Sequence, residues 1–222
     1  MDDKTAEPCG KCSNCISGDI YEGLSLSFEF QEKAAEYIDA FILKIEPRKK
    51  FPNGSFIESC YRAEEGICLS KYGDPGYGEL VKNDKYSHGQ KFDYRLVAKS
   101  VKVLRDFIVE NNITAITNVP SLRSDLVSDF SKRLARALNI NYIELIEKTV
   151  AKPQKEMENS SHQFANAWNS FSVKTRPNFE NVLLVDDIVD SRWTLTICAY
   201  KLRESGSGKV YPFVLADSSS KE

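Results

Sequence analysis

The stretch Val182–Leu195, VLLVDDIVDSRWTL, constrains the fold of this chain more than any other. Its first four residues are all apolar, which is typical of a parallel strand buried on both faces of a sheet. Asp186 and Asp187 follow directly, at the end of the strand where open α/β sheets bind their ligands. Two carboxylates at that place can hold a diol or a cation. The alternative is a buried strand whose acids only interact with solvent.

A polar turn and a helical pattern follow this strand. The turn is Asp190, Ser191 and Arg192, and apolar residues then recur at helical spacing at Leu195, Cys198, Ala199 and Leu202. Backbone N–H groups at the start of such a helix point toward any phosphate bound in the turn. The sequence therefore predicts an anion site beside the two acids.

The segment Ile113–Asp125, ITAITNVPSLRSD, predicts a second strand followed by a polar loop and a helix. We expect Asp125 to cap that helix, and Tyr142–Ile146 to form the next strand and complete a βαβ unit. The loop contains Ser121 and Arg123, a small hydrogen-bond donor and a planar charged group that both suit a phosphate. The alternative is that Arg123 is an ordinary solvated arginine.

The strand, the two acids and the turn together resemble the ribose-phosphate binding motif of the type I phosphoribosyltransferases. The resemblance implies that Asp186 and Asp187 contact the ribose hydroxyls of phosphoribosyl pyrophosphate, and that Arg123 with Ser121 contacts its pyrophosphate. It also implies that the 5′-phosphate is bound by the turn residues Asp190, Ser191, Arg192, Trp193 and Thr194. Arg192 departs from the family pattern, which has glycine or another very small residue at this position.

The polar segment Glu147–Phe171 is long enough to be a functional flap. Its Lys148, Lys152 and Lys155 are candidates to close over an anionic substrate. The order KT…PQK…NS..Q..N resembles the flap of competence-type phosphoribosyltransferases. The alternative is a solvated excursion in which the charges of the Lys and Glu residues balance.

Ahead of the strand predicted at Ile113, we expect Lys85–Lys91 to form a loop.

Three cysteines near the N-terminus, Cys9, Cys12 and Cys15, have the spacing of zinc ligands. A tetrahedral site needs a fourth ligand, and we interpret Cys60 and Cys68 as ordinary buried residues, so we expect an incomplete Zn²⁺ site. PCGKCSNC resembles the last three ligands of the zinc module in RecQ-family DNA helicases.

The chain as a whole resembles the C-terminal part of a RecQ-family helicase that carries an appended phosphoribosyltransferase-like domain. IEPRKKFPNG and EEGICLSKYGDPGYGELV add to this resemblance. The sequence has no G-x-x-x-x-G-K-[ST] loop, so no helicase motor is expected in this chain. We expect DNA to be a partner of the parent helicase rather than of this chain.

We therefore expect an α/β domain with a mainly parallel sheet flanked by helices, preceded by a small cysteine-rich and helical extension. The expected boundaries are residues 1–20 for the zinc-module tail, 21–58 for a helical segment and linker, and 59–222 for the phosphoribosyltransferase-like domain. The basic residues Lys44, Arg48, Lys49 and Lys50 could contact phosphates, but such a short run is more typical of a solvated linker, and we interpret it as one.

Composition is compatible with this organisation. The 222 residues are 41% hydrophobic, enough for a core, and the formal net charge of −2 argues against a general nucleic-acid surface. The absence of a signal peptide or long apolar run, together with cysteines that do not look paired, predicts a cytoplasmic protein.

The expected ligand is phosphoribosyl pyrophosphate or a related nucleotide, with Mg²⁺. Three functions stay open: an active phosphoribosyltransferase, a non-catalytic nucleotide sensor that regulates a helicase, and an accessory module that binds DNA or protein. In the first, the site stabilises an oxocarbenium-like ribose while pyrophosphate departs. Homodimer formation is also left open, and no membrane partner is expected.

Overall fold

A six-stranded sheet and a separate two-stranded sheet organise the chain. The computed structural model describes residues 33, 42–86, 91–149, 160–178 and 181–219. The elements, in chain order, are β1 (Leu43–Ile45), η1 (Ser59–Tyr61), β2 (Gly66–Cys68), α3 (Tyr77–Tyr86), α4 (Tyr94–Glu110), β3 (Ala115–Asn118), α5 (Leu126–Leu138), β4 (Asn141–Tyr142), β5 (Ile146–Lys148), α6 (Ser160–Ser170), β6 (Phe171–Val173), β7 (Asn181–Val189), α7 (Trp193–Glu204) and β8 (Lys209–Asp217).

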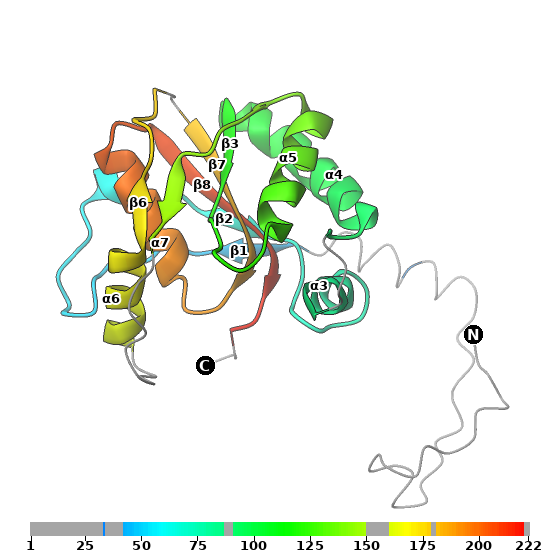
Figure 1. Cartoon of the computed structure of the whole chain (residues 1–222), viewed down its shortest axis with the longest axis horizontal. Coiled ribbons are helices and arrows are strands. Elements are labelled where there is room, and N and C mark those ends of the chain that lie inside the picture. Colours follow the sequence, from blue (N-terminus) through cyan, green and yellow to red (C-terminus); the bar gives the residue numbers. More distant parts are fainter. Residues whose placement is uncertain (1–32, 34–41, 87–90, 150–159, 179–180, 220–222) are drawn as a thin grey trace, which may run out of the picture. The chain divides into compact units, whose positions relative to one another are not determined.

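The large sheet has the strand order β1-β2-β8-β7-β3-β4 (Figure 1). Every neighbouring pair in it is parallel except β1 and β2, which are antiparallel. Helices cover both faces of the sheet: α7 lies on one side, and α4 and α5 lie on the other (Figure 1). The expected α/β architecture, with a mainly parallel sheet flanked by helices, is confirmed.

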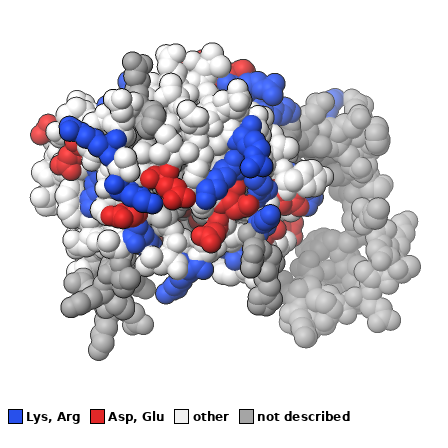
Figure 2. Space-filling view, turned by 45° about the horizontal axis from the view of Figure 1, so that its top comes forward, with Lys and Arg blue, Asp and Glu red and all other residues white. Residues whose placement is uncertain are grey.

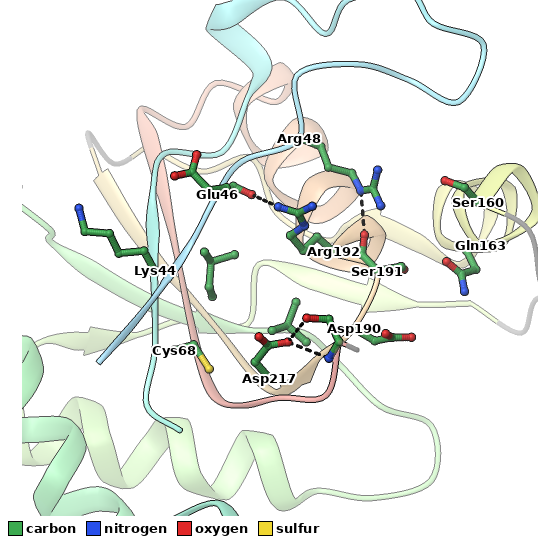
Figure 3. A pocket seen from close by; sticks show the side chains of 13 residues that line it. Lys44, Glu46, Arg48, Cys68, Ser160, Gln163, Asp190, Ser191, Arg192 and Asp217 are labelled. Carbon is green, nitrogen blue, oxygen red and sulfur yellow. Dashed lines mark hydrogen bonds between the residues drawn. The ribbon is translucent and has the colours of Figure 1, made fainter. Parts of the chain in front are cut away.

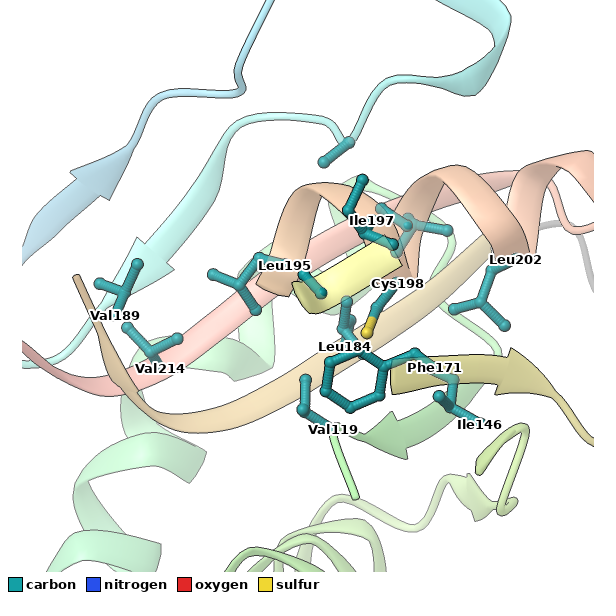
Figure 4. Packing of buried hydrophobic residues seen from close by; sticks show 14 of the residues in the cluster. Val119, Ile146, Phe171, Leu184, Val189, Leu195, Ile197, Cys198, Leu202 and Val214 are labelled. Atoms are coloured by element: carbon teal, nitrogen blue, oxygen red, sulfur yellow. The ribbon is translucent and has the colours of Figure 1, made fainter. Parts of the chain in front are cut away.

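Strand β7 is central because its four apolar residues alternate between two core layers. Val182 and Leu184 pack in the layer under α7, whereas Leu183 and Val185 pack in the layer under α4 and α5. All four are fully buried. In the first layer Leu195, Cys198 and Leu202 of α7 meet Leu184 and Val214 of the sheet (Figure 4). Because β7 is buried on both faces, the position of its carboxyl end is fixed from both sides.

The predicted βαβ unit is present as β3, α5 and β4, with β3 and β4 parallel. Its last strand is Asn141–Tyr142 and not the expected Tyr142–Ile146, because Ile146 begins β5 of the two-stranded sheet. Asp125 occupies the N-cap position of α5, as expected, but its side chain makes no capping hydrogen bond. The Ser124 hydroxyl instead accepts from the N–H of Leu126 at 3.2 Å. Asn139 closes the helix in the left-handed conformation, with φ of 55°.

The segment interpreted as a flap begins and ends in regular structure. Strands β5 and β6 pair in antiparallel orientation, and helix α6 leads directly into β6. Lys152 and Lys155 lie outside the described residues, so the structure describes only the two ends of the predicted flap.

The beginning of the chain differs from expectation where it is described. Strand β1, starting at Leu43, pairs with β2 in the large sheet, although we expected residues 21–58 to be a helical segment and linker. A strand of three residues is too short to show a period of two in the sequence. The chain divides into two units, residues 1–41 and 42–222. Of the first unit only Lys33 is described, and Cys9, Cys12 and Cys15 lie outside the described residues.

The described surface carries both signs of charge. Figure 2 shows lysine and arginine side chains intermingled with aspartate and glutamate on one face. Among the helices that the structure describes, none is both long enough and apolar enough to cross a bilayer.

Candidate functional site

Asp186 and Asp187 are the sixth and seventh of the nine residues of β7, which continues to Val189, so the strand runs past the acids instead of ending before them as expected. Asp186 and Asp187 are partly buried, and an Asp186 carboxylate oxygen accepts from the backbone N–H of Asp187 at 2.9 Å. Burial, and after it the nearby charge of Asp187, raises the pKa of Asp186 to about 8. At neutral pH Asp186 is therefore protonated, and its hydroxyl can donate a hydrogen bond.

A lysine from a different element faces the second acid. Lys85, in the last turn of α3, places its ammonium nitrogen 2.9 Å from a carboxylate oxygen of Asp187. The two side chains are only 32% and 16% exposed. We expected Lys85 to be in a loop, but α3 continues through Tyr86. The helix holds Lys85 beside the acid pair, which the sequence pattern did not predict.

The turn after β7 has a backbone conformation that is unusual for its sequence. Arg192 is in the left-handed region, with φ of 66° and ψ of 0°, where glycine is far more common. It is the N-cap residue of α7, and its side chain makes no capping hydrogen bond. The first N–H groups of α7 therefore have no acceptor within the helix or from the cap. Such a helix start attracts anions.

The side chain of Arg192 points away from its own turn. Its guanidinium donates to the backbone oxygen of Glu46 at 3.1 Å, in the segment after β1 (Figure 3). Arg192 thus keeps the backbone conformation expected of a glycine and uses its side chain for a contact with another segment.

Arg48, from the segment after β1 that contains Glu46, also contacts the turn. Arg48 donates through Nε to the backbone oxygen of Ser191 at 2.7 Å (Figure 3). Its guanidinium also lies 4.2 Å from the centre of the Trp193 ring. Trp193, 2% exposed, donates through its indole nitrogen to the hydroxyl of Ser160 at 2.8 Å. We interpreted Arg48 as a linker residue, because no local pattern distinguishes it from a solvated arginine.

The predicted site residues within the described part of the chain meet at one cavity of about 650 Å³, which we call the acid-pair cavity. Its wall includes all of them: Ser121, Arg123, Lys148, Asp186, Asp187, Asp190, Ser191, Arg192, Trp193 and Thr194. Lys85 lines it too, as do Gln163 and Asn166 of α6. Ser121 and Arg123 are exposed, and the Ser121 hydroxyl accepts from the N–H of Arg123 at 3.2 Å. The placement of Trp193 differs from the others, because most of its side chain is packed in the core.

A second cavity of about 590 Å³, the β1 cavity, is also lined by the turn residues Asp190, Ser191 and Arg192 (Figure 3). It is lined by Lys44, Glu46 and Arg48 from the β1 segment, and by Cys68 and Asp217 from the ends of β2 and β8. Asp217 pairs with Lys71, and the hydroxyl of Ser219 donates to it at 2.6 Å. The turn Asp190–Arg192 therefore contributes to the walls of two cavities.

The described cysteines do not assemble a metal centre. Cys68 is buried as expected, whereas Cys60 is exposed. Burial raises the pKa of the Cys68 thiol to about 12, which suits an inert thiol. Within residues 42–86, 91–149, 160–178 and 181–219, no group of three His, Cys, Asp or Glu side chains is placed to hold a metal ion.

Comparisons with known proteins find resemblances at low identity. No family model and no curated protein matches the chain. Among solved structures, an adenine phosphoribosyltransferase is 16% identical with a TM-score of 0.38, over 57% of this chain and 81% of that one. A purine phosphoribosyltransferase from Pyrococcus horikoshii Ot3 is 14% identical with a TM-score of 0.38, over 58% and 87%. The adenine phosphoribosyltransferase from Leishmania tarentolae is 13% identical with a TM-score of 0.37, over 78% and 94%. Because these TM-scores are all below 0.5, function must be inferred from the site residues.

Proposed function

We propose that the acid-pair cavity binds a phosphorylated ribose, either phosphoribosyl pyrophosphate or a related nucleotide. One observation carries this proposal. A single cavity of about 650 Å³ contains an acid pair, a helix N-terminus without a side-chain cap, and the basic side chains of Arg123 and Lys148. The acids suit ribose hydroxyls, whereas the helix start suits a phosphate.

The two acids would act differently on a ribose. Protonated Asp186 can donate to one hydroxyl oxygen, because its pKa of about 8 keeps the proton in place at neutral pH. Asp187 is available as an acceptor for a hydroxyl hydrogen on the side away from Lys85. Arg123 and Lys148 would then contact a second anionic group, such as pyrophosphate.

In this proposal Mg²⁺ binds only together with the ligand. The acid pair does not fit a resident metal ion, because Asp186 is protonated and the Lys85 ammonium group already lies against Asp187. Phosphate oxygens of a pyrophosphate ligand would supply the hard donors that Mg²⁺ prefers.

We also propose, from the sequence motifs, that the chain is the C-terminal part of a RecQ-family DNA helicase, with Cys9, Cys12 and Cys15 as ligands of Zn²⁺.

A non-catalytic nucleotide sensor is the second candidate function of the acid-pair cavity. It is favoured by Arg192, whose side chain fixes the turn to Glu46 and limits its freedom to rearrange during turnover. Measurement of pyrophosphate release from phosphoribosyl pyrophosphate with each nucleobase separates a transferase from a sensor.

Isothermal titration calorimetry with phosphoribosyl pyrophosphate and ribose 5-phosphate tests the proposed binding site. We expect Asp187→Asn to weaken binding of both by about tenfold or more, the effect of losing one hydrogen bond to a charged group. Glu144→Gln is the matched control, because Glu144 is an exposed acid that pairs with Lys132 and does not line the cavity. Equal affinities for all three proteins would contradict the site.

A further inference from the structure

The Lys85–Asp187 ion pair places a cationic side chain directly against one of the two acids of the acid-pair cavity. The ammonium group approaches Asp187 to 2.9 Å, and it belongs to α3 rather than to the strand that carries the acids. Both side chains are mostly shielded from water. An ion pair shielded in this way is less weakened by salt than one on the surface.

The charged side chains around the cavity favour an anion over a cation. Among the described residues, its wall contains four basic residues and three acids. Arg192 directs its guanidinium to Glu46, which leaves Lys85, Arg123 and Lys148 as the bases at the cavity. One of the three acids, Asp186, is neutral at pH 7 because of its raised pKa. A phosphate group therefore meets net positive charge without any added metal ion, whereas Mg²⁺ meets an acid whose charge is already compensated.

We propose that Lys85 takes the place of a divalent cation at the acid pair, so that this domain binds ribose phosphate monoesters without a metal ion. The ligand class rests on the proposed function, whereas the exclusion of the metal rests on the contact between Lys85 and Asp187, which the proton on Asp186 supports. The ammonium group neutralises Asp187 and blocks the approach of a second cation to the same oxygen. A ligand with pyrophosphate can still bring Mg²⁺ with it.

The first test uses the metal alone and needs no organic ligand. Mn²⁺, a paramagnetic substitute for Mg²⁺, is titrated into the full chain and followed by electron paramagnetic resonance. Because the Lys85 ammonium group lies against Asp187, we expect wild type to show no binding that depends on Asp187. Lys85→Met should bind Mn²⁺ at least tenfold more tightly than wild type.

Further variants test whether the Mn²⁺ binding gained in Lys85→Met depends on the Asp187 carboxylate. Adding Asp187→Asn to Lys85→Met should abolish the gained site, and Lys85→Arg should exclude the metal as wild type does. Lys82→Met, an exposed lysine on the same helix, should behave as wild type. Wild-type binding of Mn²⁺ that is lost in Asp187→Asn would overturn the proposal, as would a Lys85→Met protein with no gain. Circular dichroism confirms that each variant is folded.

The second test measures ribose 5-phosphate binding in buffer with EDTA or with Mg²⁺. Wild type should bind equally in both, within about twofold, whereas Lys85→Met should bind at least tenfold more weakly in EDTA and recover with Mg²⁺. A wild-type requirement for Mg²⁺ would overturn the proposal. If wild type binds ribose 5-phosphate in neither buffer, the proposed function fails, and the Mn²⁺ titration still decides the role of Lys85.

Discussion

Asp186 couples the stability of the fold to pH. Its carboxyl group has a pKa of about 8 in the folded chain, whereas an unfolded aspartate titrates near 3.9. Between these values only the folded chain binds the proton, so the stability contributed by Asp186 is complete below about pH 4 and declines as the pH rises to about 8.

We predict that replacing Asp186 with Asn flattens this dependence. The difference in unfolding free energy between wild type and the variant should change by up to ~1.4 kcal/mol per pH unit, in favour of the variant as the pH rises. Urea unfolding at pH 5, 6, 7 and 8 measures it. Asp190→Asn, an exposed acid in the following turn, is the control and should keep the wild-type slope. Parallel curves for wild type and Asp186→Asn would show that the carboxyl group is ionised in the folded state.

Arg192 combines a backbone strain with a compensating side-chain contact. A left-handed residue other than glycine costs about 1 kcal/mol or more, and the hydrogen bond to Glu46 offsets part of that cost. We predict that Arg192→Gly is more stable than Arg192→Met by about 1 kcal/mol, because both lose the side-chain contact and only Gly relieves the strain. Thermal unfolding of the two variants side by side measures the difference. Equal stability would mean that the turn relaxes out of the left-handed conformation in Arg192→Met.

At the scale of elements, the segment after β1 supports the turn before α7. Arg48 donates to Ser191 and stacks on Trp193, whose ring also contacts Phe164 of α6. The hydrogen bond and the cation–π contact together suggest a contribution of about 1–3 kcal/mol. Loss of Arg48 should therefore loosen both the turn and the packing around Trp193.

Fluorescence of Trp193 measures this effect directly, because the chain has only two tryptophans. In a Trp168→Phe background, we predict that Arg48→Met lowers the unfolding free energy by about 1–3 kcal/mol and makes Trp193 more accessible to acrylamide quenching. Lys49→Met, an exposed neighbour in sequence, should change neither quantity. If Arg48→Met leaves quenching unchanged, the turn is held by α7 and β7 alone.

Gly78 of helix α3 packs closely against the backbone of Lys71. A Cβ atom at Gly78 would overlap the backbone oxygen of Lys71, so α3 would have to move. We predict that Gly78→Ala costs about 1–3 kcal/mol in urea unfolding, whereas Lys82→Ala on the same helix costs less than about 0.5 kcal/mol. A neutral Gly78→Ala would show that α3 can shift without loss of packing.

The sequence predicted the elements that have long patterns and missed contacts between distant segments. The apolar run of β7 and the helical spacing from Val127 are visible in the sequence because each spans a complete element. Strands β1 and β2 have three residues each, so only their pairing defines them. Asp186 and Asp187 are adjacent in sequence and were predicted together. Lys85 and Arg48 come from other elements, and neither has a local pattern that indicates its partner.

At the scale of the whole molecule, two core layers share the central sheet. One layer contains α7 and the ends of the flap segment, and the other contains α3, α4 and α5, with β7 and β8 contributing to both. Because the same strands belong to both layers, we expect residues 42–222 to unfold as one cooperative unit. The acid-pair cavity draws residues from elements on both sides of this sheet, so its integrity depends on that cooperativity.

The segment 42–58 is part of this unit, and its removal tests the boundary. Ile45 and Ile57 are 5% and 0% exposed, so a protein that begins at residue 59 loses two core side chains together with β1 and Arg48. Loss of one buried isoleucine side chain alone typically costs about 2–5 kcal/mol. We predict that a protein of residues 42–222 shows a single cooperative urea transition, whereas residues 59–222 lose at least about 3 kcal/mol or fail to fold. Equal transition midpoints would place the start of the folded domain at residue 59, and β1 would then be an addition that the sheet does not need.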